Sequence, residues 1–368
     1  MKRLWAGALL AMAGLAACGG DEGAPRTPGE MQTTAGGGGD RVQLTGAGAT
    51  FPYPIYARWF SDYEQANPVR VNYQSIGSGG GIRQLTEGTV DFGASDAPMN
   101  QEELAKAPGT LHIPTVIGAV AVTYNLPGLA QPLKLSGEVL ADIFLGRLTK
   151  WNDPRLQQLN PGVALPNRDI LVVHRTDASG TTYVFTEYLA AVSPAWQQQV
   201  GMGKSVKWPT GLGAKGNEGV TGQVRQTEGA VGYVEQVYAT QNNLPVAAVQ
   251  NAAGRFVAPT LEASAAAAAG AQEKLAGSPD FRISLVNAAG ADAYPISTWT
   301  YLLVPAQMPD CTKAQALVQV VRWALTDGSV AARELGYAPL PDAVRDAVFT
   351  KLGSITCGAN RQPVSSAS

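Results

Sequence analysis

The sequence predicts an α/β protein with a mostly parallel sheet that is covered by helices on both faces. From residue 41 onward, short β-branched or apolar runs alternate with segments whose apolar residues recur at helical spacing. Alternating units of this kind are typical of parallel sheets flanked by helices. The chain is 45% hydrophobic and 15% charged, which is enough apolar surface for a large core or two lobes of ordinary size.

The first residues have the pattern of an export signal. Lys2 and Arg3 precede the apolar run 4–17, which is too short to span a bilayer and ends in Leu15-Ala16-Ala17-Cys18. That ending resembles the lipobox of bacterial lipoproteins. We therefore expect residues 1–17 to be a signal peptide, cut before Cys18, which would carry the lipid. The alternative is a plain signal cleaved nearby, with Cys18 incidental.

Residues 18–40 contain almost no large apolar side chains, so they cannot bury enough surface to offset the cost of ordering. We expect a flexible tether that holds the folded body away from a membrane surface. No later apolar stretch is long enough for a transmembrane helix. The net charge of −2 gives no basic field for nucleic acid.

The folded body begins at about residue 41, and periodicity places its elements. Several strands end directly at small or hydroxyl residues, and the run 211–219 is expected to be a glycine-rich loop. The alanine-rich segment 263–271 is expected to be a surface helix. The expected strands are 42–44, 69–73, 90–93, 115–124, 170–173, 230–234 and 298–304, and the expected helices are 55–63, a short one carrying Ile82 and Leu85, 139–144, one after 154, 183–189, 263–271 and 314–325.

Three strand-to-helix turns share one design, with small and hydroxyl residues at the start of the helix. They are Ala49-Thr50-Phe51, Gly77 to Gly81, and Ser179-Gly180-Thr181. Helix N-termini present free backbone N–H groups and the positive end of the helix dipole, which suit an oxyanion. If the turns converge, they form one cage of donors, to which Arg175 adds a positive charge. The alternative for each turn is an ordinary capped helix.

Two acidic residues lie close to these turns. Asp96 follows a further strand, and a carboxylate in an anion site is repulsive unless the anion donates a hydrogen to it. Hydrogen phosphate carries such a hydrogen, whereas sulfate does not. Asp96 could instead cap the turn before Pro98. Asp177 could orient Arg175 through an ion pair, or cap its own turn.

Five stretches of the chain together resemble the periplasmic phosphate-binding proteins of ABC-type phosphate importers. The stretches are Thr45-Gly-Ala-Gly-Ala-Thr-Phe-Pro52, Ile76-Gly-Ser-Gly-Gly-Gly81, Val90-Asp-Phe-Gly-Ala-Ser-Asp-Ala-Pro98, Arg175 to Thr182, and Trp208-Pro-Thr-Gly-Leu-Gly-Ala-Lys-Gly-Asn217. The resemblance runs from about 43 to about 345. It implies the type II periplasmic binding protein fold, with two α/β lobes hinged by two crossing strands. Lobe 1 would be 41–115 plus 296–368, and lobe 2 would be 116–295.

The resemblance also implies a site and a function. The residues that match the family's phosphate ligands are Thr50, Phe51 (through its backbone N–H), Ser78, Asp96, Arg175, Ser179, Gly180 and Thr181. Gly79 departs from a common family form, which has a second serine there. We expect a non-enzymatic receptor without cofactor or metal, monomeric and lipid-anchored at Cys18 outside the cytoplasmic membrane. It would capture inorganic phosphate between its lobes and deliver it to the permease subunits of an ABC importer.

Residue patterns argue against several other functions. A secreted hydrolase would use Ser179 with His174 or Asp177, but the chain has no Gly-x-Ser-x-Gly elbow. With only two histidines and no cluster of ligands, a metal enzyme is disfavoured. The same fold could also serve sulfate or molybdate, against which Asp96 argues. No Gly-Lys-Ser/Thr follows the glycine-rich turns, which disfavours nucleotide binding.

Cys311 and Cys357 are the only cysteines of the body. In an exported protein such a pair favours a disulfide, here one that ties the C-terminal tail to the start of the last long helix. Two unpaired thiols are the alternative.

Overall fold

The computed structural model describes residues 41–364 apart from 130 and 272–279. The predicted signal peptide (1–17) and tether (18–40), including Cys18, lie outside the described residues. By backbone contacts, 40–368 forms one compact unit. The lobe boundaries at 115/116 and 295/296 therefore stay a prediction.

A nine-stranded sheet runs through the described part of the chain, in the order β2-β1-β3-β11-β4-β8-β6-β7, with β13 paired to β4. Its strands are β1 (Val42–Gly48), β2 (Val69–Ser75), β3 (Phe92–Ser95), β4 (Thr110–Tyr124), β6 (Leu171–Arg175), β7 (Leu212–Ala214), β8 (Ala230–Glu235), β11 (Ser297–Pro305) and β13 (Ala338–Pro339). The first lobe contains β1, β2 and β3, and the second contains β6, β7 and β8. Each group of three is parallel within itself.

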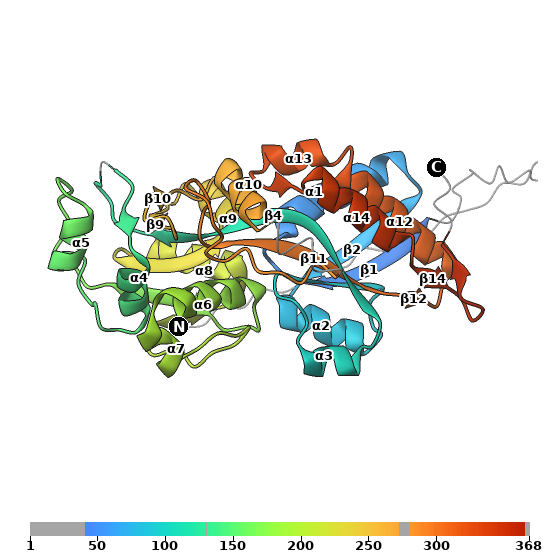
Figure 1. The fold of residues 1–368 in the computed structure, drawn as a ribbon, viewed down its shortest axis with the longest axis horizontal. Helices are drawn as coiled ribbons and strands as arrows, with labels where there is room; N and C mark the ends of the chain where they lie inside the picture. Colours follow the sequence, from blue (N-terminus) through green and yellow to red (C-terminus); the bar gives the residue numbers. More distant parts are fainter. Residues whose placement is uncertain (1–40, 130, 272–279, 365–368) are drawn as a thin grey trace, which may run out of the picture. The chain divides into compact units, whose positions relative to one another are not determined.

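The centre of the sheet is antiparallel, which corrects the prediction of a mostly parallel sheet. β11 runs antiparallel to β3 and β4, and β4 runs antiparallel to β8. The reason is that β4 carries the chain from the first lobe to the second and β11 carries it back. Pairing places residues 110–119 of β4 beside β11 and residues 120–124 beside β8. Figure 1 shows these two long strands passing between the lobes, as the predicted two-strand hinge requires.

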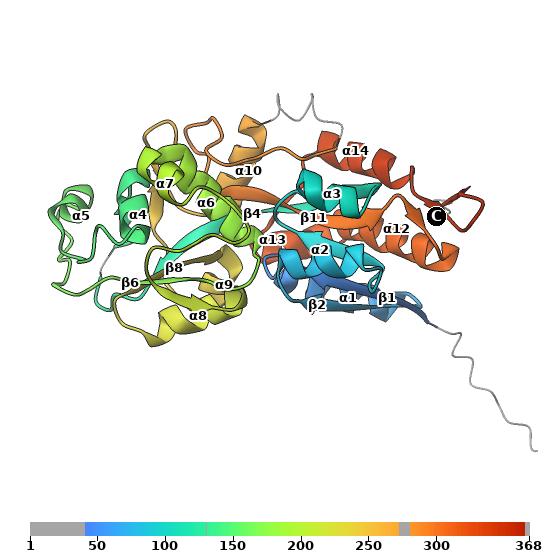
Figure 2. The same ribbon diagram turned by 90° about the horizontal axis from the view of Figure 1, so that it is seen from below.

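Helices cover both faces of the sheet, as predicted. In Figures 1 and 2, α1 and α12 lie on one side of the first-lobe strands and α2 lies on the other. The helices are α1 (Tyr53–Ala66), α2 (Ser78–Thr86), α3 (Gln101–Lys106), α4 (Gly137–Phe144), α5 (Pro154–Leu159), α6 (Gly180–Val192), α7 (Pro194–Gln199), α8 (Gly216–Gln226), α9 (Gln236–Gln241), α10 (Leu261–Gly270), α12 (Cys311–Leu325), α13 (Ser329–Glu334) and α14 (Asp342–Leu352).

The apolar spacing of α1 shows why these segments form buried-face helices. Ile55, Tyr56, Trp59, Phe60 and Tyr63 recur three and four residues apart, and all five are buried against the sheet. The alanine-rich helix α10 is only partly on the surface, because one of its faces packs on β4 and β11. Among the residues that the structure describes, no helix is both long and apolar enough to cross a membrane.

Two small sheets complete the fold. One contains β5 (Lys134–Leu135), β9 (Ala248–Gln250) and β10 (Phe256–Val257), and the other contains β12 (Gln307–Met308), β14 (Thr356–Cys357) and β15 (Gln362–Pro363). A disulfide joins Cys311, the first residue of α12, to Cys357 in β14, which confirms the predicted pair.

The run 211–219 is more regular than the predicted glycine-rich loop. It contains strand β7 and the first turn of α8, which begins at Gly216. Gly216 has φ +71°, a left-handed conformation that glycine adopts without strain, so the chain can turn sharply from strand into helix.

Candidate oxyanion-binding site

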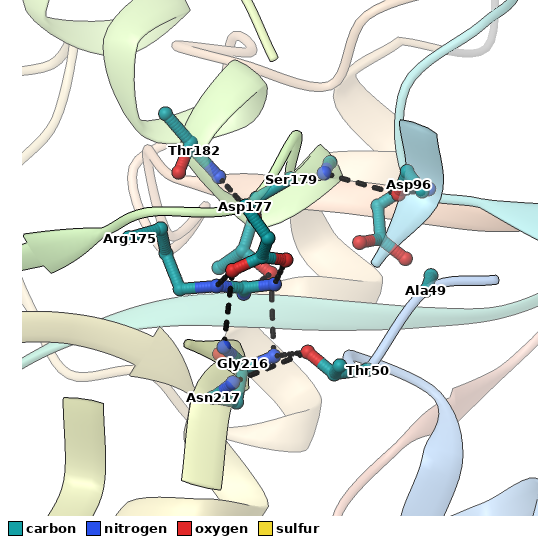
Figure 3. A network of polar contacts seen from close by, with 12 residues as sticks. Ala49, Thr50, Asp96, Arg175, Asp177, Ser179, Thr182, Gly216 and Asn217 are labelled. Atoms are coloured by element: carbon teal, nitrogen blue, oxygen red, sulfur yellow. Dashed lines mark hydrogen bonds and ion pairs between the residues drawn. The ribbon is translucent and has the colours of Figure 1, made fainter. Parts of the chain in front are cut away.

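The three predicted turns come together between the lobes. The backbone N–H of Gly180, at the start of α6, donates to Oγ of Ser78 at 3.0 Å. The side-chain amide of Asn217 donates to Oγ1 of Thr50 at 2.8 Å and to Oγ1 of Thr181 at 3.3 Å. Residues from three separate motifs and from both lobes therefore form one network, shown in Figure 3. We call this set, namely Thr50, Ser78, Asp96, Arg175, Ser179, Gly180 and Thr181, the donor cage.

The donor cage is shut off from water. Its polar side chains are at most 3% exposed: Thr50, Ser78, Asp96, Arg175, Ser179 and Thr181. Burial lowers the local dielectric, so hydrogen bonds and charges here act more strongly than they would at the surface. Polar groups are costly to bury without hydrogen-bond partners. In this structure the cage side chains have partners within the protein, such as Ser78 with Gly180 and Thr50 with Asn217.

Gly180 lies at a close approach between the lobes. A Cβ at this position would lie 2.5 Å from Oγ of Ser78 and 2.6 Å from Oδ2 of Asp96. Any larger residue would push the first turn of α6 away from the opposite lobe. The glycine thus allows the N-terminus of α6 to meet α2 and the end of β3.

Arg175 is the cation of the donor cage, and Asp177 fixes its direction. The guanidinium donates from Nε to Oδ1 of Asp177 at 2.8 Å and from Nη2 to Oδ2 at 2.5 Å. Nη1 contacts Oγ1 of Thr181 at 3.4 Å. Asp177 also accepts from the backbone N–H of Gly216 at 3.0 Å, which ties it to α8. Of the two predicted roles for Asp177, the structure shows the orientation of Arg175.

This ion pair keeps both groups charged despite their burial. Burial alone would lower the pKa of Arg175, but the hydrogen bonds and charge of Asp177 outweigh it and hold that pKa above its usual value. Burial likewise opposes ionisation of Asp177, whose pKa the guanidinium nevertheless keeps below its usual value. Arg175 therefore remains a guanidinium cation at any physiological pH, with its charge balanced by the Asp177 carboxylate.

Asp96 lies across the donor cage from Arg175, as Figure 3 shows. It directly follows β3, and Oδ1 accepts a hydrogen bond from Thr300 of β11 at 2.9 Å. The turn before Pro98 is held instead by Oγ of Ser95, which accepts from the backbone N–H of Ala97 at 3.2 Å. The structure therefore gives Asp96 a position in the cage, and the cap of this turn is Ser95.

Asp96 is poised to exchange a proton near neutrality. Burial raises the pKa of its carboxyl to about 7, against the lowering effects of the Thr300 hydrogen bond and the Arg175 charge. The charge of Asp177 adds to the upward shift. Asp96 can thus accept a hydrogen from an acidic oxyanion, or hold the proton itself, at little cost near pH 7.

Three tyrosines hold the turn that precedes α1. Tyr73 donates to the carbonyl of Ala49 at 2.8 Å, Tyr238 to that of Thr50 at 2.6 Å, and Tyr337 to that of Phe51 at 2.7 Å. The carbonyl of one residue and the N–H of the next belong to one planar trans peptide and point in opposite directions. Fixing the Ala49 and Thr50 carbonyls therefore also fixes the N–H groups of Thr50 and Phe51.

The phenyl ring of Phe51 is buried against Tyr337, with ring centroids 6.3 Å apart. Only its backbone is thus available to a ligand, in line with the role that the resemblance implies. Its predicted N–H contact with phosphate stays a prediction, as do the ligand roles of the other cage residues.

The residue that departs from the family form, Gly79, packs against the opposite lobe. Its N–H donates to the carbonyl of Ala178 at 2.9 Å, and a Cβ here would lie 2.4 Å from Cβ of Ala178. A serine at this position would therefore collide with Ala178. In this chain the methyl group of Ala178 occupies the space of the missing side chain.

The hydrolase alternative gains no support from the geometry. Oγ of Ser179 accepts from the backbone N–H of Thr182 at 3.0 Å, as an N-cap does. Nδ1 of His174 contacts the carbonyl of Arg175, and its ring stacks on Trp208 at 4.8 Å. Within the described ranges, neither His174 nor Asp177 hydrogen-bonds to Ser179.

Sequence reasoning missed several residues that build the site. Asn217 stands in the stretch 208–217 without a predicted role, yet it joins Thr50 to Thr181 and accepts the N–H of Glu235 at 2.9 Å. Thr300, which holds Asp96, was not singled out by the sequence, because Ser297 and Thr298 are hydroxyl residues of the same strand. The three tyrosines carried no recognisable sequence signal either, because buried tyrosines are common in cores.

Two parallel α/β groups joined by β4 and β11, with the buried donor cage between them, are the architecture of bilobal substrate-binding proteins. In agreement, the family model described as "PBP superfamily domain" matches residues 33–327. A phosphate-binding protein PstS from Pasteurella multocida (strain Pm70) is 51% identical over 304 residues, covering 82% of this chain and 87% of that protein.

A phosphate-binding protein PstS from Haemophilus influenzae (strain ATCC 51907 / DSM 11121 / KW20 / Rd) is 48% identical over 300 residues, covering 81% of this chain and 89% of that protein. The crystal structure of a phosphate-binding protein from Stenotrophomonas maltophilia has the same fold, with a TM-score of 0.66 at 23% identity. The match covers 84% of this chain and 93% of that one. The chain therefore belongs to the PstS family of phosphate-binding proteins.

Proposed function

We propose that this protein binds inorganic phosphate in the donor cage as the substrate-binding component of an ABC phosphate importer. The observation that carries this proposal is the chemistry of the cage. Hydroxyl and backbone donors surround a fixed cation, and a single carboxylate with a pKa of about 7 faces them. Relatives at 48–51% identity are named phosphate-binding proteins, which supports the same ligand here.

The proposed phosphate contacts come from both lobes. Thr50, the N–H of Phe51, Ser78 and Asp96 act from the first lobe. Arg175, Ser179, Gly180 and Thr181 act from the second. In this structure the N–H of Gly180 donates to Oγ of Ser78. When phosphate binds, the Ser78 hydroxyl and the Gly180 N–H would each donate to a phosphate oxygen instead. Ligands from both lobes make phosphate binding favour the closed arrangement.

Asp96 supplies the selectivity. It accepts the hydrogen of HPO₄²⁻ or H₂PO₄⁻, whereas a sulfate oxygen would face the carboxylate without a hydrogen between them. This argues against a receptor for sulfate or molybdate. Capture and release require no bond to be broken, so the protein acts as a carrier and not as an enzyme.

The N-terminal pattern and the family support a proposal for the location and the partners. The signal-like run 1–17 and the lipobox-like ending support export and lipid attachment at Cys18, with 18–40 as a tether. The body would then act as a monomer beside the permease subunits of its importer. Mass spectrometry of the membrane fraction tests the anchor, because a diacylglyceryl group on Cys18 is expected and an unmodified new N-terminus would contradict it.

Equilibrium dialysis of the phosphate-stripped body against radiolabelled phosphate tests the function. We expect one phosphate per chain, displaced by unlabelled phosphate or arsenate but not by sulfate. Turnover of a chromogenic phosphate ester would favour the hydrolase alternative instead. Failure to retain phosphate, or displacement by sulfate at equal concentration, would contradict the proposal.

A further inference from the structure

An ion pair joins the two lobes outside the donor cage. Nζ of Lys204 lies 2.6 Å from Oε2 of Glu103. Glu103 belongs to α3 of the first lobe, whereas Lys204 lies between α7 and β7 of the second. The two side chains are 14% and 22% exposed, so the pair is largely covered.

The glutamate end of the pair is fixed by a helix cap. Oε2 of Glu103 also accepts the backbone N–H of Asn100 at 2.9 Å, while Oδ1 of Asn100 accepts the N–H of Glu103 at 2.9 Å. This reciprocal capping box begins α3, four residues beyond Asp96. The carboxylate is thus held in place on the segment that follows the acceptor of the cage.

The lysine end is fixed to the other wall of the cage. The carbonyl of Lys204 accepts the backbone N–H of Ser179 at 2.8 Å. The N–H of the preceding Gly203 donates to Oγ1 of Thr186 at 3.1 Å, which attaches this segment to α6 at a second point. The ion pair therefore connects the segment after Asp96 with the segment that supports Ser179.

Another ion pair on α3 provides a natural comparison. Lys106 lies 2.7 Å from Glu102, but both residues belong to the same helix and their side chains are 63% and 76% exposed. Such a pair is screened by water and does not depend on how the lobes are arranged. The Lys204–Glu103 pair is covered, and it must break whenever the lobes separate.

We propose that the Lys204–Glu103 ion pair is a positioning element that holds the lobes together and slows the release of phosphate. This inference rests on the proposed phosphate-binding function. Because the pair exists only when the lobes are closed, its loss should speed opening and dissociation. It should leave the association rate unchanged, since phosphate enters the open form before the pair is made.

The test is a chase experiment on the body loaded with radiolabelled phosphate. Lys204→Met removes the charge but keeps the carbonyl that holds Ser179, and Glu103→Gln keeps an oxygen for the capping box. Each single variant should release phosphate about three- to tenfold faster than the parent, with an unchanged association rate. The double variant should release it no faster than either single variant. Lys106→Met serves as the matched control and should release phosphate at the parent's rate.

Salt gives an independent readout. Raising sodium chloride from about 50 mM to about 500 mM should narrow the difference in release rate between parent and double variant, because added ions screen the pair. Release rates of the single variants equal to the parent's, or additive effects in the double variant, would overturn this inference while leaving phosphate binding intact. A parent that retains no phosphate would overturn the proposed function and this inference together.

Discussion

The hydroxyl of Thr300 donates a 2.9 Å hydrogen bond to Oδ1 of Asp96. Thr300 lies in β11, one of the two strands that pass between the lobes, so the hinge itself holds the acidic side chain of the donor cage. Asp96 needs this support because it is buried and follows the last residue of β3. Without this hydrogen bond the carboxyl group could rotate freely, and ordering it on ligand binding would cost conformational entropy.

Thr300→Val keeps the shape of the side chain and removes this hydroxyl. We expect phosphate affinity to fall about tenfold, since a hydrogen bond to a charged group contributes about 1.5–3 kcal/mol. Isothermal titration at neutral pH measures the change. Thr298→Val is the matched control. The Thr298 hydroxyl donates to the backbone carbonyl of Asp96 at 3.3 Å and to that of Trp299 at 2.9 Å, and among the described residues it makes no hydrogen bond to the Asp96 carboxyl group. Equal losses in both variants would show that the Asp96 side chain is not held through Thr300.

The stability of the phosphate-free protein should depend on pH through Asp96. Burial raises the pKa of this carboxyl from 3.8 to about 7, so folding favours its protonated form. The resulting stabilisation is complete below about pH 4 and is lost as the pH rises through about 7. Between about pH 5 and about pH 8, the free energy of unfolding of the parent should fall by about 2–3 kcal/mol relative to Asp96→Asn.

Urea unfolding of both stripped proteins at the two pH values measures this difference. Acids that do not interact with Asp96 contribute equally to both proteins and cancel. Glu235 cancels only in part, because the charge of Asp96 adds to the burial that raises the pKa of Glu235. Parallel pH profiles for parent and variant would show that Asp96 is already ionised at low pH.

Arg175→Ala should nearly abolish binding. The guanidinium is the cation of the cage, and the substitution removes charge-assisted hydrogen bonds that hydroxyl groups cannot replace. With two such bonds at about 1.5–3 kcal/mol each, we expect affinity to fall on the order of a thousandfold. The substitution also leaves Asp177 buried without its partner, so the titration should be paired with a measurement of thermal unfolding. A loss of less than tenfold would place Arg175 outside the phosphate site.

Asn217→Ala should weaken binding even though the resemblance gives Asn217 no ligand role. The amide holds the hydroxyls of Thr50 and Thr181 from opposite lobes, so its loss frees both groups. We expect affinity to fall about tenfold or more, from two neutral hydrogen bonds at about 1 kcal/mol each. Asn125→Ala is the control, since the Asn125 amide also bonds within the fold, to the carbonyls of Val224 and Arg225. If both variants lose stability and neither loses affinity, Asn217 acts only in folding.

Local sequence patterns were enough to predict most of the elements. In α1 the apolar residues recur at helical spacing, and in β2 apolar and polar residues alternate. Both patterns arise because one face of the element is buried, so they can be recognised in the local sequence. The antiparallel centre of the sheet was not predictable in this way. Strand direction depends on which strand the chain returns to, and residues 115–124 read as the same apolar run in either direction.

The donor cage was predicted from helix-start chemistry, because Thr50, Ser78 and Ser179 each stand where a strand leads into a helix. The residues that hold the donor cage in place could not be predicted from the sequence, for a physical reason. Asn217, Thr300 and Tyr238 act through tertiary contacts between segments far apart in the chain, and such contacts leave no local pattern. The Lys204–Glu103 pair is a further case, since two charged residues about a hundred positions apart look like ordinary surface charges.

In the proposed site, Asp96 is the one cage side chain that accepts a hydrogen from the ligand. It therefore discriminates between oxyanions that carry such a hydrogen and those that do not. Sites that hydrogen-bond a ligand hydroxyl can reject analogues lacking it by roughly 10⁴–10⁵-fold. Asp96→Asn replaces the carboxylate with an amide that can either accept or donate. The variant should still bind phosphate and should gain affinity for sulfate, because the repulsion is removed.

Calorimetric titration of the stripped parent and of Asp96→Asn, each with phosphate and with sulfate, tests this claim most directly. It is done at about pH 8.5, above the pKa of about 7, so that Asp96 is ionised and cannot donate a proton to sulfate. We expect the parent to bind phosphate and to show no heat with sulfate, whereas the variant should bind both anions. If Asp96→Asn rejects sulfate as firmly as the parent does, selectivity does not come from Asp96 and the central claim is wrong.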